Sequence, residues 1–127
     1  MPKRPIKTNS APPPGGAYSQ AIAAGNLVFL AGQGPFRPSG EKVEGSFEEE
    51  ARQTFSNLAA VAEAAGGSLA DAVRVGVFLR DMENFPSMND VYRAFFPEPL
   101  PARTTIQSDL PGFEIEVDAV LLIEGSD

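Results

Sequence analysis

Arg103 and Glu116 are the charged residues whose positions best suit chemistry on a small molecule. Arg103 stands in Pro-Ala-Arg-Thr-Thr, at the start of a stretch that reads as a β-strand. A guanidinium that faces inward beside small residues can bind a carboxylate through two parallel hydrogen bonds. Glu116 and Asp118 share one side of the last strand-like stretch, where a carboxyl group in a cleft would have a raised pKa and could handle water. By pattern alone, a solvated surface position is favoured for each of these charges.

Two other places can supply polar groups to such a cleft. Gly32-Gln33-Gly34 lacks the third glycine and the following helix of a dinucleotide-binding motif, but a glycine there can expose its backbone N–H to an anion. Tyr18 directly follows Gly15-Gly16-Ala17 and suits either a cleft or a cap over the core. Neither signal is specific by itself.

Cysteine and histidine are absent from the 127 residues, and this restricts the chemistry. It removes disulfides, thiolate nucleophiles, zinc sites built from Cys and His, and triads with an imidazole base. No Asp and Glu cluster with the spacing of metal ligands stands out. Any catalysis must rely on carboxylates, Arg, Lys, Tyr, hydroxyls, backbone amides and water, so we expect no metal and no organic cofactor.

The net charge of −7 opposes approach to a phosphate backbone, so nucleic acid is not an expected partner. The basic residues gather only at Lys3, Arg4 and Lys7. No apolar stretch is long enough for a membrane span or a signal sequence. We therefore expect a soluble, cytoplasmic protein with no membrane partner.

The elements that position these residues follow from the hydrophobic periodicity. We expect a hairpin over residues 18–33, a helix over 46–65 that starts with a Ser46 and Glu49 capping box, a strand over 73–79, a helix over 85–96 capped by Asn84, and strands over 103–108 and 114–123 joined at 110–112. The proline-rich residues 1–17 predict an extended leader without strand pairing. Residues 1–127 then form one α+β domain in the order ββαβαββ, with both helices on one face of the sheet.

The last strand predicts an oligomer. One of its sides is fully apolar, and the other still carries Val120 and Leu122 beside its acidic residues. A solvated face does not need these two side chains, and two helices cover only one side of a sheet. We therefore expect another copy of the chain to cover this face, with sites between the subunits.

Several short motifs follow one another in a characteristic order along almost the whole chain. They include Tyr18-Ser19-Gln20, Ala31-Gly32-Gln33, Glu63-Ala64-Ala65-Gly66, Pro101-Ala102-Arg103 and Ile115-Glu116. Together they resemble the RidA (YjgF) family of reactive-intermediate deaminases. The resemblance implies a chorismate-mutase-like fold, a homotrimer with clefts at its subunit interfaces, and hydrolysis of 2-imino acids, formed from enamines such as 2-aminoacrylate, to 2-oxo acids and ammonia.

The resemblance also implies roles for single residues. Arg103 matches the carboxylate-binding arginine of the family, and Glu116 matches the glutamate that handles water. The positions that match the lining of the cleft are Tyr18, Ala31, Gly32, Asn89 and Thr105. Of these, we place Tyr18 with the catalytic residues and the others with the substrate-binding residues.

The chain departs from the family pattern at several positions. Ala31 stands where a serine is common, Ala17 where a proline is usual and Thr105 where a cysteine is frequent, and the loops over 97–100 and between Arg103 and Glu116 are shorter. The missing serine hydroxyl keeps a second function open, a regulatory protein that binds small carboxylates without turnover. A third, endoribonuclease, is disfavoured by the charge and the absence of histidine.

Overall fold

The computed structural model describes residues 2–124. Its strands and helices are β1 (Arg4–Ile6), β2 (Ala21–Ala24), β3 (Leu27–Gln33), α1 (Phe47–Ala64), β4 (Ala72–Leu79), α2 (Phe85–Phe95), β5 (Ala102–Gln107) and β6 (Ile115–Leu122). Short 3-10 helices cover Leu69–Asp71 and Met82–Asn84. The predicted hairpin, helices and later strands are all present, with ends that differ by a few residues from the predicted ones.

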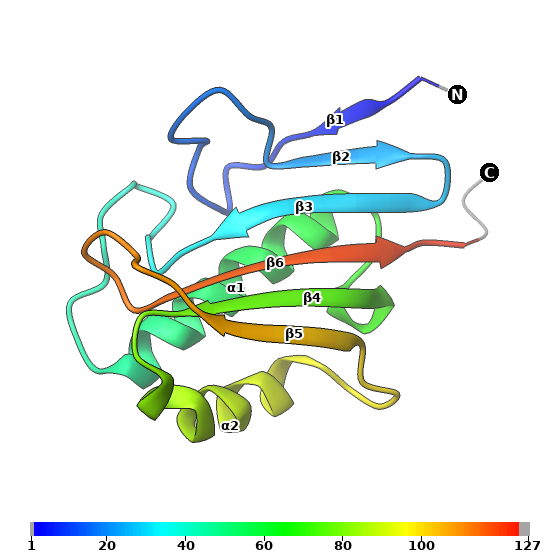
Figure 1. Ribbon diagram of the computed structural model, residues 1–127. Coiled ribbons are helices and arrows are strands. Elements are labelled where there is room, and N and C mark those ends of the chain that lie inside the picture. The colour runs from blue at the N-terminus through cyan, green and yellow to red at the C-terminus, as the bar shows by residue number, and fades with distance from the viewer. Residues whose placement is uncertain (1, 125–127) are drawn as a thin grey trace.

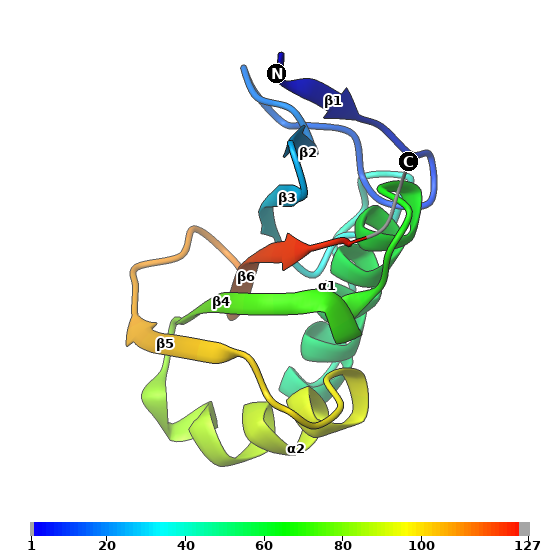
Figure 2. The same cartoon turned by 90° about the vertical axis from the view of Figure 1, so that its right-hand side faces the viewer.

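The strands form one sheet in the order β1-β2-β3-β6-β4-β5 (Figure 1). Neighbouring strands are antiparallel except β4 and β5, which are parallel and are joined through α2. Helix α1 packs against β3 and β6, and α2 packs against α1 (Figure 2). The prediction of an α+β fold with its helices on one face of the sheet is confirmed.

Helix α1 begins where the capping motif predicts. The Ser46 hydroxyl accepts the N–H of Glu49, and the Glu49 carboxylate accepts the N–H of Ser46, so two N–H groups without helical partners are satisfied. Phe55 and Leu58 lie on the buried side of this helix and are fully enclosed. The core therefore lies between this helix and the sheet.

Residues 1–17 do not form an unpaired leader as predicted. Arg4–Ile6 adds strand β1 to the sheet, with Pro5 opposite Ile22. The prediction failed because β1 is the edge strand of the sheet. Proline is tolerated there when its nitrogen, which carries no hydrogen, faces solvent and not the neighbouring strand. The segment after β1 is tied down by Gln20, whose side chain binds the backbone of Thr8 and Pro12.

Two further predictions about local structure are wrong. Asn84 precedes α2 but makes no side-chain cap, because a 3-10 turn capped by Asp81 leads directly into the helix. Strands β5 and β6 are not neighbours, because β4 lies between them. A parallel β4-α2-β5 unit leaves the other side of β4 free, and the returning chain pairs there.

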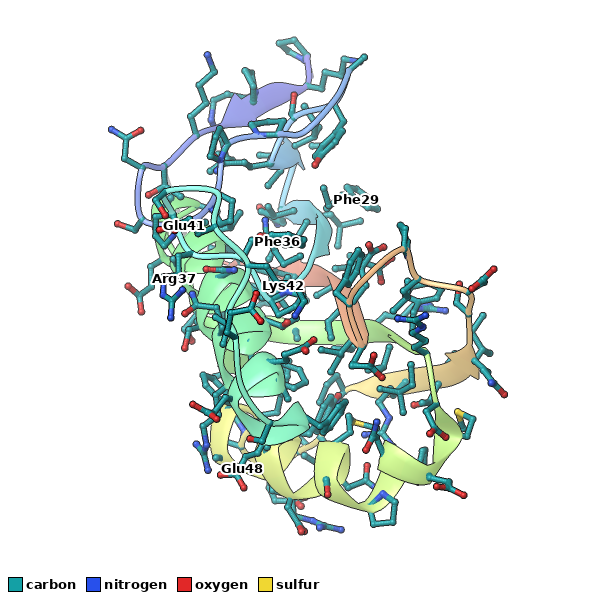
Figure 3. All side chains as sticks on the ribbon, turned by 90° about the vertical axis from the view of Figure 1, so that its left-hand side faces the viewer. Phe29, Phe36, Arg37, Glu41, Lys42 and Glu48 are labelled. Carbon is teal, nitrogen blue, oxygen red and sulfur yellow. The ribbon has the colours of Figure 1, made fainter. Side chains whose placement is uncertain are left out.

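The face of the sheet opposite the helices, which we call the open face, carries exposed apolar side chains. Phe29 projects from β3 on the side away from α1 (Figure 3) and is 45% exposed, and Ile106 on β5 is 47% exposed. Val120 pairs with Phe29 across β3 and β6. The expected apolar character of this face is therefore present, and its cover by another copy of the chain stays a prediction.

Candidate active site

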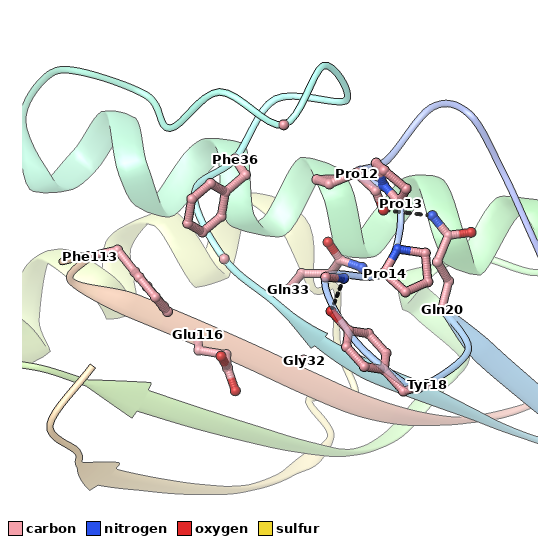
Figure 4. A pocket seen from close by; sticks show the side chains of 13 residues that line it. Pro12, Pro13, Pro14, Tyr18, Gln20, Gly32, Gln33, Phe36, Phe113 and Glu116 are labelled. Carbon is pink, nitrogen blue, oxygen red and sulfur yellow. Dashed lines mark hydrogen bonds between the residues drawn. The ribbon is translucent and has the colours of Figure 1, made fainter. Parts of the chain in front are cut away.

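A cavity of about 470 Å³ lies where the ends of β3 and β6 meet the segment 12–18 (Figure 4). Its wall includes Pro12, Pro13, Pro14, Tyr18, Gly32, Phe36, Phe113 and Glu116. Glu116 is the only charged side chain in the lining that the structure describes. The cavity therefore presents one carboxylate to an otherwise uncharged space.

Gly32 gives the Glu116 carboxylate its place. A Cβ atom at position 32 would lie 2.7 Å from Oε2 of Glu116, closer than nonbonded atoms approach. The register of β3 against β6 also shifts between Leu30 and Gln33, as at a β-bulge, which re-aims the backbone beside a site. Any larger residue at position 32 would displace the carboxylate.

Burial raises the pKa of Glu116, and the neighbouring negative charge of Asp118 raises it further. Asp118 itself is held by the backbone N–H of Gly76, which its Oδ1 accepts at 3.1 Å. A carboxyl group with a raised pKa exchanges its proton more readily near neutral pH than an ordinary one does. Glu116 is therefore suited to take a proton from water and to return it.

The Arg103 guanidinium is held by aromatic faces. Its central carbon lies 4.7 Å from the ring centroid of Tyr92 and 5.5 Å from that of Phe85, and Nη1 is 3.8 Å from the Met88 sulfur. Among residues 2–124, Arg103 forms no ion pair with a carboxylate. Aromatic contacts at its faces orient a guanidinium but leave the N–H groups at its edge, in its own plane, free to donate. Arg103 is therefore available to an anion.

A second pocket of about 320 Å³ surrounds Arg103, and Asn89 lines it as well. Two buried hydroxyl oxygens, on Tyr92 and on Thr105, have no hydrogen-bond partner among the residues that the structure describes. Burial raises the pKa of the Tyr92 hydroxyl, and the nearby positive charge of Arg103 opposes that rise. A buried hydroxyl without a partner costs about 1–3 kcal/mol, which a bound polar group can offset.

Arg103 and Glu116 lie on opposite faces of the sheet. Arg103 pairs with Val75, which is fully buried under the helices, whereas Glu116 pairs with Phe78, whose other partner is the exposed Ile106. We expected the two groups to face one enclosed pocket from neighbouring strands, and within one chain this expectation is wrong. The cause is β4, which lies between the two strands and pairs with both. Side chains alternate between the faces along a strand, and the two registers place Arg103 and Glu116 on alternate sides.

Of the other predicted residues, Tyr18, Gly32 and Asn89 each line one of the two pockets, whereas Thr105 and Ala31 line neither. Tyr18 and Gly32 line the cavity of Glu116, and the Tyr18 hydroxyl accepts the N–H of Gly15 at 3.0 Å. The lining of neither pocket includes Ala31, which is only partly exposed on β3. Asn89 and Thr105 lie on the Arg103 side, as described above.

Phe36, Phe113 and the prolines of the segment 12–14 were not predicted as site residues. Phe36 and Phe113 belong to loops and follow no helical or strand periodicity, so hydrophobic periodicity does not mark them. The sequence signal for these two positions is an aromatic residue in a loop next to glycine or proline, where binding residues are frequent. Tyr92 was predicted, but only as a core residue of the second helix.

A family model described as Endoribonuclease L-PSP matches residues 8–123, nearly the whole chain. The chain belongs to this family, the RidA (YjgF) family. A 2-iminobutanoate/2-iminopropanoate deaminase of Dermatophagoides farinae is 44% identical over 126 residues, which cover 97% of this chain and 98% of that protein. The mitochondrial protein mmf2 of Schizosaccharomyces pombe is 40% identical, over 84% of this chain and 87% of that protein. The mitochondrial protein MMF1 of Saccharomyces cerevisiae is 41% identical, over 91% of this chain and 83% of that protein.

Solved structures of RidA family members have the same fold. RidA from Psychrobacter sp. PAMC 21119 is 40% identical with a TM-score of 0.90, over 94% of this chain and 99% of that one. TdcF of Escherichia coli, solved with bound serine, is 32% identical with a TM-score of 0.88, over 94% of this chain and 98% of that one. Both the predicted family and the predicted fold are confirmed.

Asp118→Asn is expected to shift the pH dependence of this RidA family site. Removing the Asp118 charge removes a cause that raises the pKa of Glu116, so that pKa should fall. The asparagine oxygen can still accept the N–H of Gly76, which preserves the local structure. In the imine hydrolysis proposed below, the acid limb of kcat/KM should therefore move to lower pH, and an unchanged limb in the pH–rate profile would mean that Glu116 does not control it.

Among the residues that the structure describes, no group of three His, Cys, Asp or Glu side chains is placed to hold a metal ion. Within the same residues, no helix is long and apolar enough to cross a membrane.

Proposed function

We propose that the chain hydrolyses 2-imino acids to 2-oxo acids and ammonia, in a site that two copies of the chain build together. The observation that carries the proposal is the division of two suitable groups between opposite faces of one sheet. Arg103 forms no ion pair among the described residues, and Glu116 has a raised pKa in a cavity of its own. The relative named as a deaminase supports this chemistry.

A head-to-tail arrangement of copies would bring the two groups together. Arg103 belongs to β5, the last strand of the sheet, so its side chain lies near an outer edge of the molecule. Glu116 belongs to the open face, where Phe29 and Ile106 are exposed. Placing the β5 edge of one copy over the open face of the next would cover apolar surface and complete a site. Repeating the same rotation from copy to copy gives a closed ring, such as the expected homotrimer, when it returns to the first copy.

The reaction then needs positioning and one acid/base group. Arg103 binds the substrate carboxylate through two hydrogen bonds, and the backbone N–H groups of Gly32 and Thr105 contribute further donors. This fixes the adjacent C=N carbon in front of Glu116 of the other copy. Tyr18 offers its hydroxyl to the same space.

Water supplies the oxygen of the product. Glu116 takes one proton from the water as the water oxygen bonds to the C=N carbon, and it returns this proton to the imine nitrogen, which becomes an amine. The hydroxyl proton of this tetrahedral intermediate then passes through Glu116 to the amine as the C–N bond breaks, so ammonia departs and the 2-oxo acid remains. The carboxyl of Glu116 ends in its starting state, so no external reactant besides water is consumed.

Binding of a small carboxylate without turnover is the second candidate. TdcF of Escherichia coli was solved with bound serine, which is an amino acid with a free carboxylate. Arg103 alone would suffice for such binding, and Ala31 supplies no hydroxyl to order a water molecule. The family description also names an endoribonuclease, and the net charge of −7 still opposes contact with RNA. The cytoplasmic location stays a prediction, because two relatives are mitochondrial by name.

An amino-acid oxidase that generates imines in solution tests the proposal. We expect the wild-type chain to accelerate the appearance of 2-oxo acid and ammonia above the uncatalysed rate. Saturable binding of 2-oxo acids without acceleration would instead establish the binding protein. Cleavage of RNA by a nuclease-free preparation, lost on mutation of the site, would establish the third function.

A further inference from the structure

We propose that Phe36 and Phe113 contact the side chain of the substrate and favour 2-imino acids whose side chain is apolar and longer than methyl. This inference rests on the proposed function. Both rings line the cavity of Glu116, and their centroids are 5.4 Å apart at an interplanar angle of 74°, an edge-to-face pair. Figure 4 shows the two rings on one side of the cavity, with Tyr18 and the prolines across from them.

The backbone that carries the Phe36 ring is held by α1. Nδ2 of Asn57, which is 1% exposed, donates to the carbonyl oxygens of Gly34 at 3.1 Å and of Phe36 at 2.6 Å. Gly34 leaves room for the rings, since a Cβ there would lie 3.0 Å from Phe36 and 3.5 Å from Phe113. The loop after β3 is therefore fixed with its aromatic ring against the cavity.

The ring of Phe113 is fixed by a second contact from α1. Glu50 is 5% exposed, and its Oε1 accepts the N–H of Glu114 at 3.0 Å, while Oε2 pairs with Lys42 at 3.3 Å. Glu114 directly follows Phe113, so this buried carboxylate sets the backbone that carries the ring. Two anchors of one helix therefore hold the aromatic pair, and a rigid wall discriminates better between ligands than a mobile one does.

The opposite wall is also uncharged. Pro12, Pro13 and Pro14 line it, and the side-chain amide of Gln20 donates to the Pro12 carbonyl at 2.8 Å. The volume of about 470 Å³ exceeds what the smallest 2-imino acids fill. Glu116 repels a second carboxylate, so an acidic side chain is disfavoured. An apolar side chain between these walls would remove aromatic and proline surface from water.

Phe113→Ala and Phe36→Ala test the inference, with imines made from alanine, leucine, methionine and glutamate. We expect the wild-type chain to prefer the leucine and methionine imines, because one methylene group in an apolar pocket is worth roughly 10-fold or more in kcat/KM. Each variant should lose about 10-fold on these two imines and change little on the alanine imine. Both rings are partly exposed in the wild-type chain, so the variants should fold.

Met82→Ala is the matched control, since Met82 is also an exposed apolar side chain but lines neither pocket. It should leave the order of preference unchanged. Equal losses on all four imines in Phe36→Ala and Phe113→Ala, or no wild-type preference for apolar imines, would overturn the inference while leaving the deaminase proposal intact. If the wild-type chain hydrolyses no imine, calorimetric binding of pyruvate, 4-methyl-2-oxopentanoate and 2-oxoglutarate gives the same comparison, and equal affinities would overturn the inference there.

Discussion

Arg103→Ala is expected to lower kcat/KM for every 2-imino acid by about a thousandfold, since truncating one member of a buried, hydrogen-bonded charge pair costs about 2–5 kcal/mol. The lost group is the one that binds the carboxylate, which all these substrates share. The loss should therefore not depend on the substrate side chain. Steady-state kinetics with the imines of alanine and leucine measure both the size of the loss and this independence.

Two further variants separate the charge of Arg103 from its packing. Arg103→Met keeps an apolar chain against Tyr92 without the charge, and it should be as inactive as the alanine variant. Arg93→Ala removes another arginine that lines the same pocket, but this side chain is 69% exposed and, within residues 2–124, forms an ion pair only with Asp90. It should keep nearly full activity. Equal activity of Arg103→Met and wild type would mean that Arg103 does not bind the substrate.

Glu116→Gln is expected to lower kcat by about 10²- to 10⁴-fold, because it removes general acid–base catalysis. Glutamine has nearly the same shape and fits the space that Gly32 leaves, so the fold should be preserved. KM should change little, since Glu116 does not bind the carboxylate. Comparable melting temperatures of variant and wild type confirm that the loss is chemical.

Mixed assemblies of the two inactive variants test the division of the site between copies. If each site takes Arg103 from one chain and Glu116 from another, every mixed trimer of Arg103→Ala and Glu116→Gln chains should contain one complete site, about a third of the wild-type number. The two chains would be expressed together with different tags and purified through both. Mixtures of either variant with itself should stay inactive.

A mixture that stays inactive, although both tags are present, would show that Arg103 and Glu116 act from the same chain. In that case one of them would have to leave the place it has in the structure. The opposite parity of their positions makes this a large rearrangement, because a strand must slip by one residue to move a side chain to the other face.

Most of the fold was predictable because its signals are local. The capping box at Ser46 and Glu49 and the apolar face of β6 each report the position of their own element. Strand β1 was missed because the tolerance of a sheet edge for Pro5 depends on what lies beside it. The order of the strands was missed for a related reason, since nothing local in β5 or β6 shows that β4 pairs with both.

The residues of the site were predictable mainly through the family resemblance. Arg103 and Glu116 look like ordinary surface charges in the sequence, and only the fold shows one stacked on Tyr92 and the other beside Gly32. Their separation onto two faces could not be predicted, because it depends on the registers of three strands. Phe36 and Phe113 became visible only when two distant loops were brought together.

The placement of Arg103 and Glu116 on two faces of one sheet has a consequence for how activity depends on protein concentration. A site shared by copies exists only while the copies are associated, so mass action governs how many sites there are. Specific activity should then stay constant on dilution until the assembly begins to dissociate, and fall steeply below that concentration. Isolated chains would lack a complete site, and a substitution of the exposed Phe29 should lower activity without touching a reacting group.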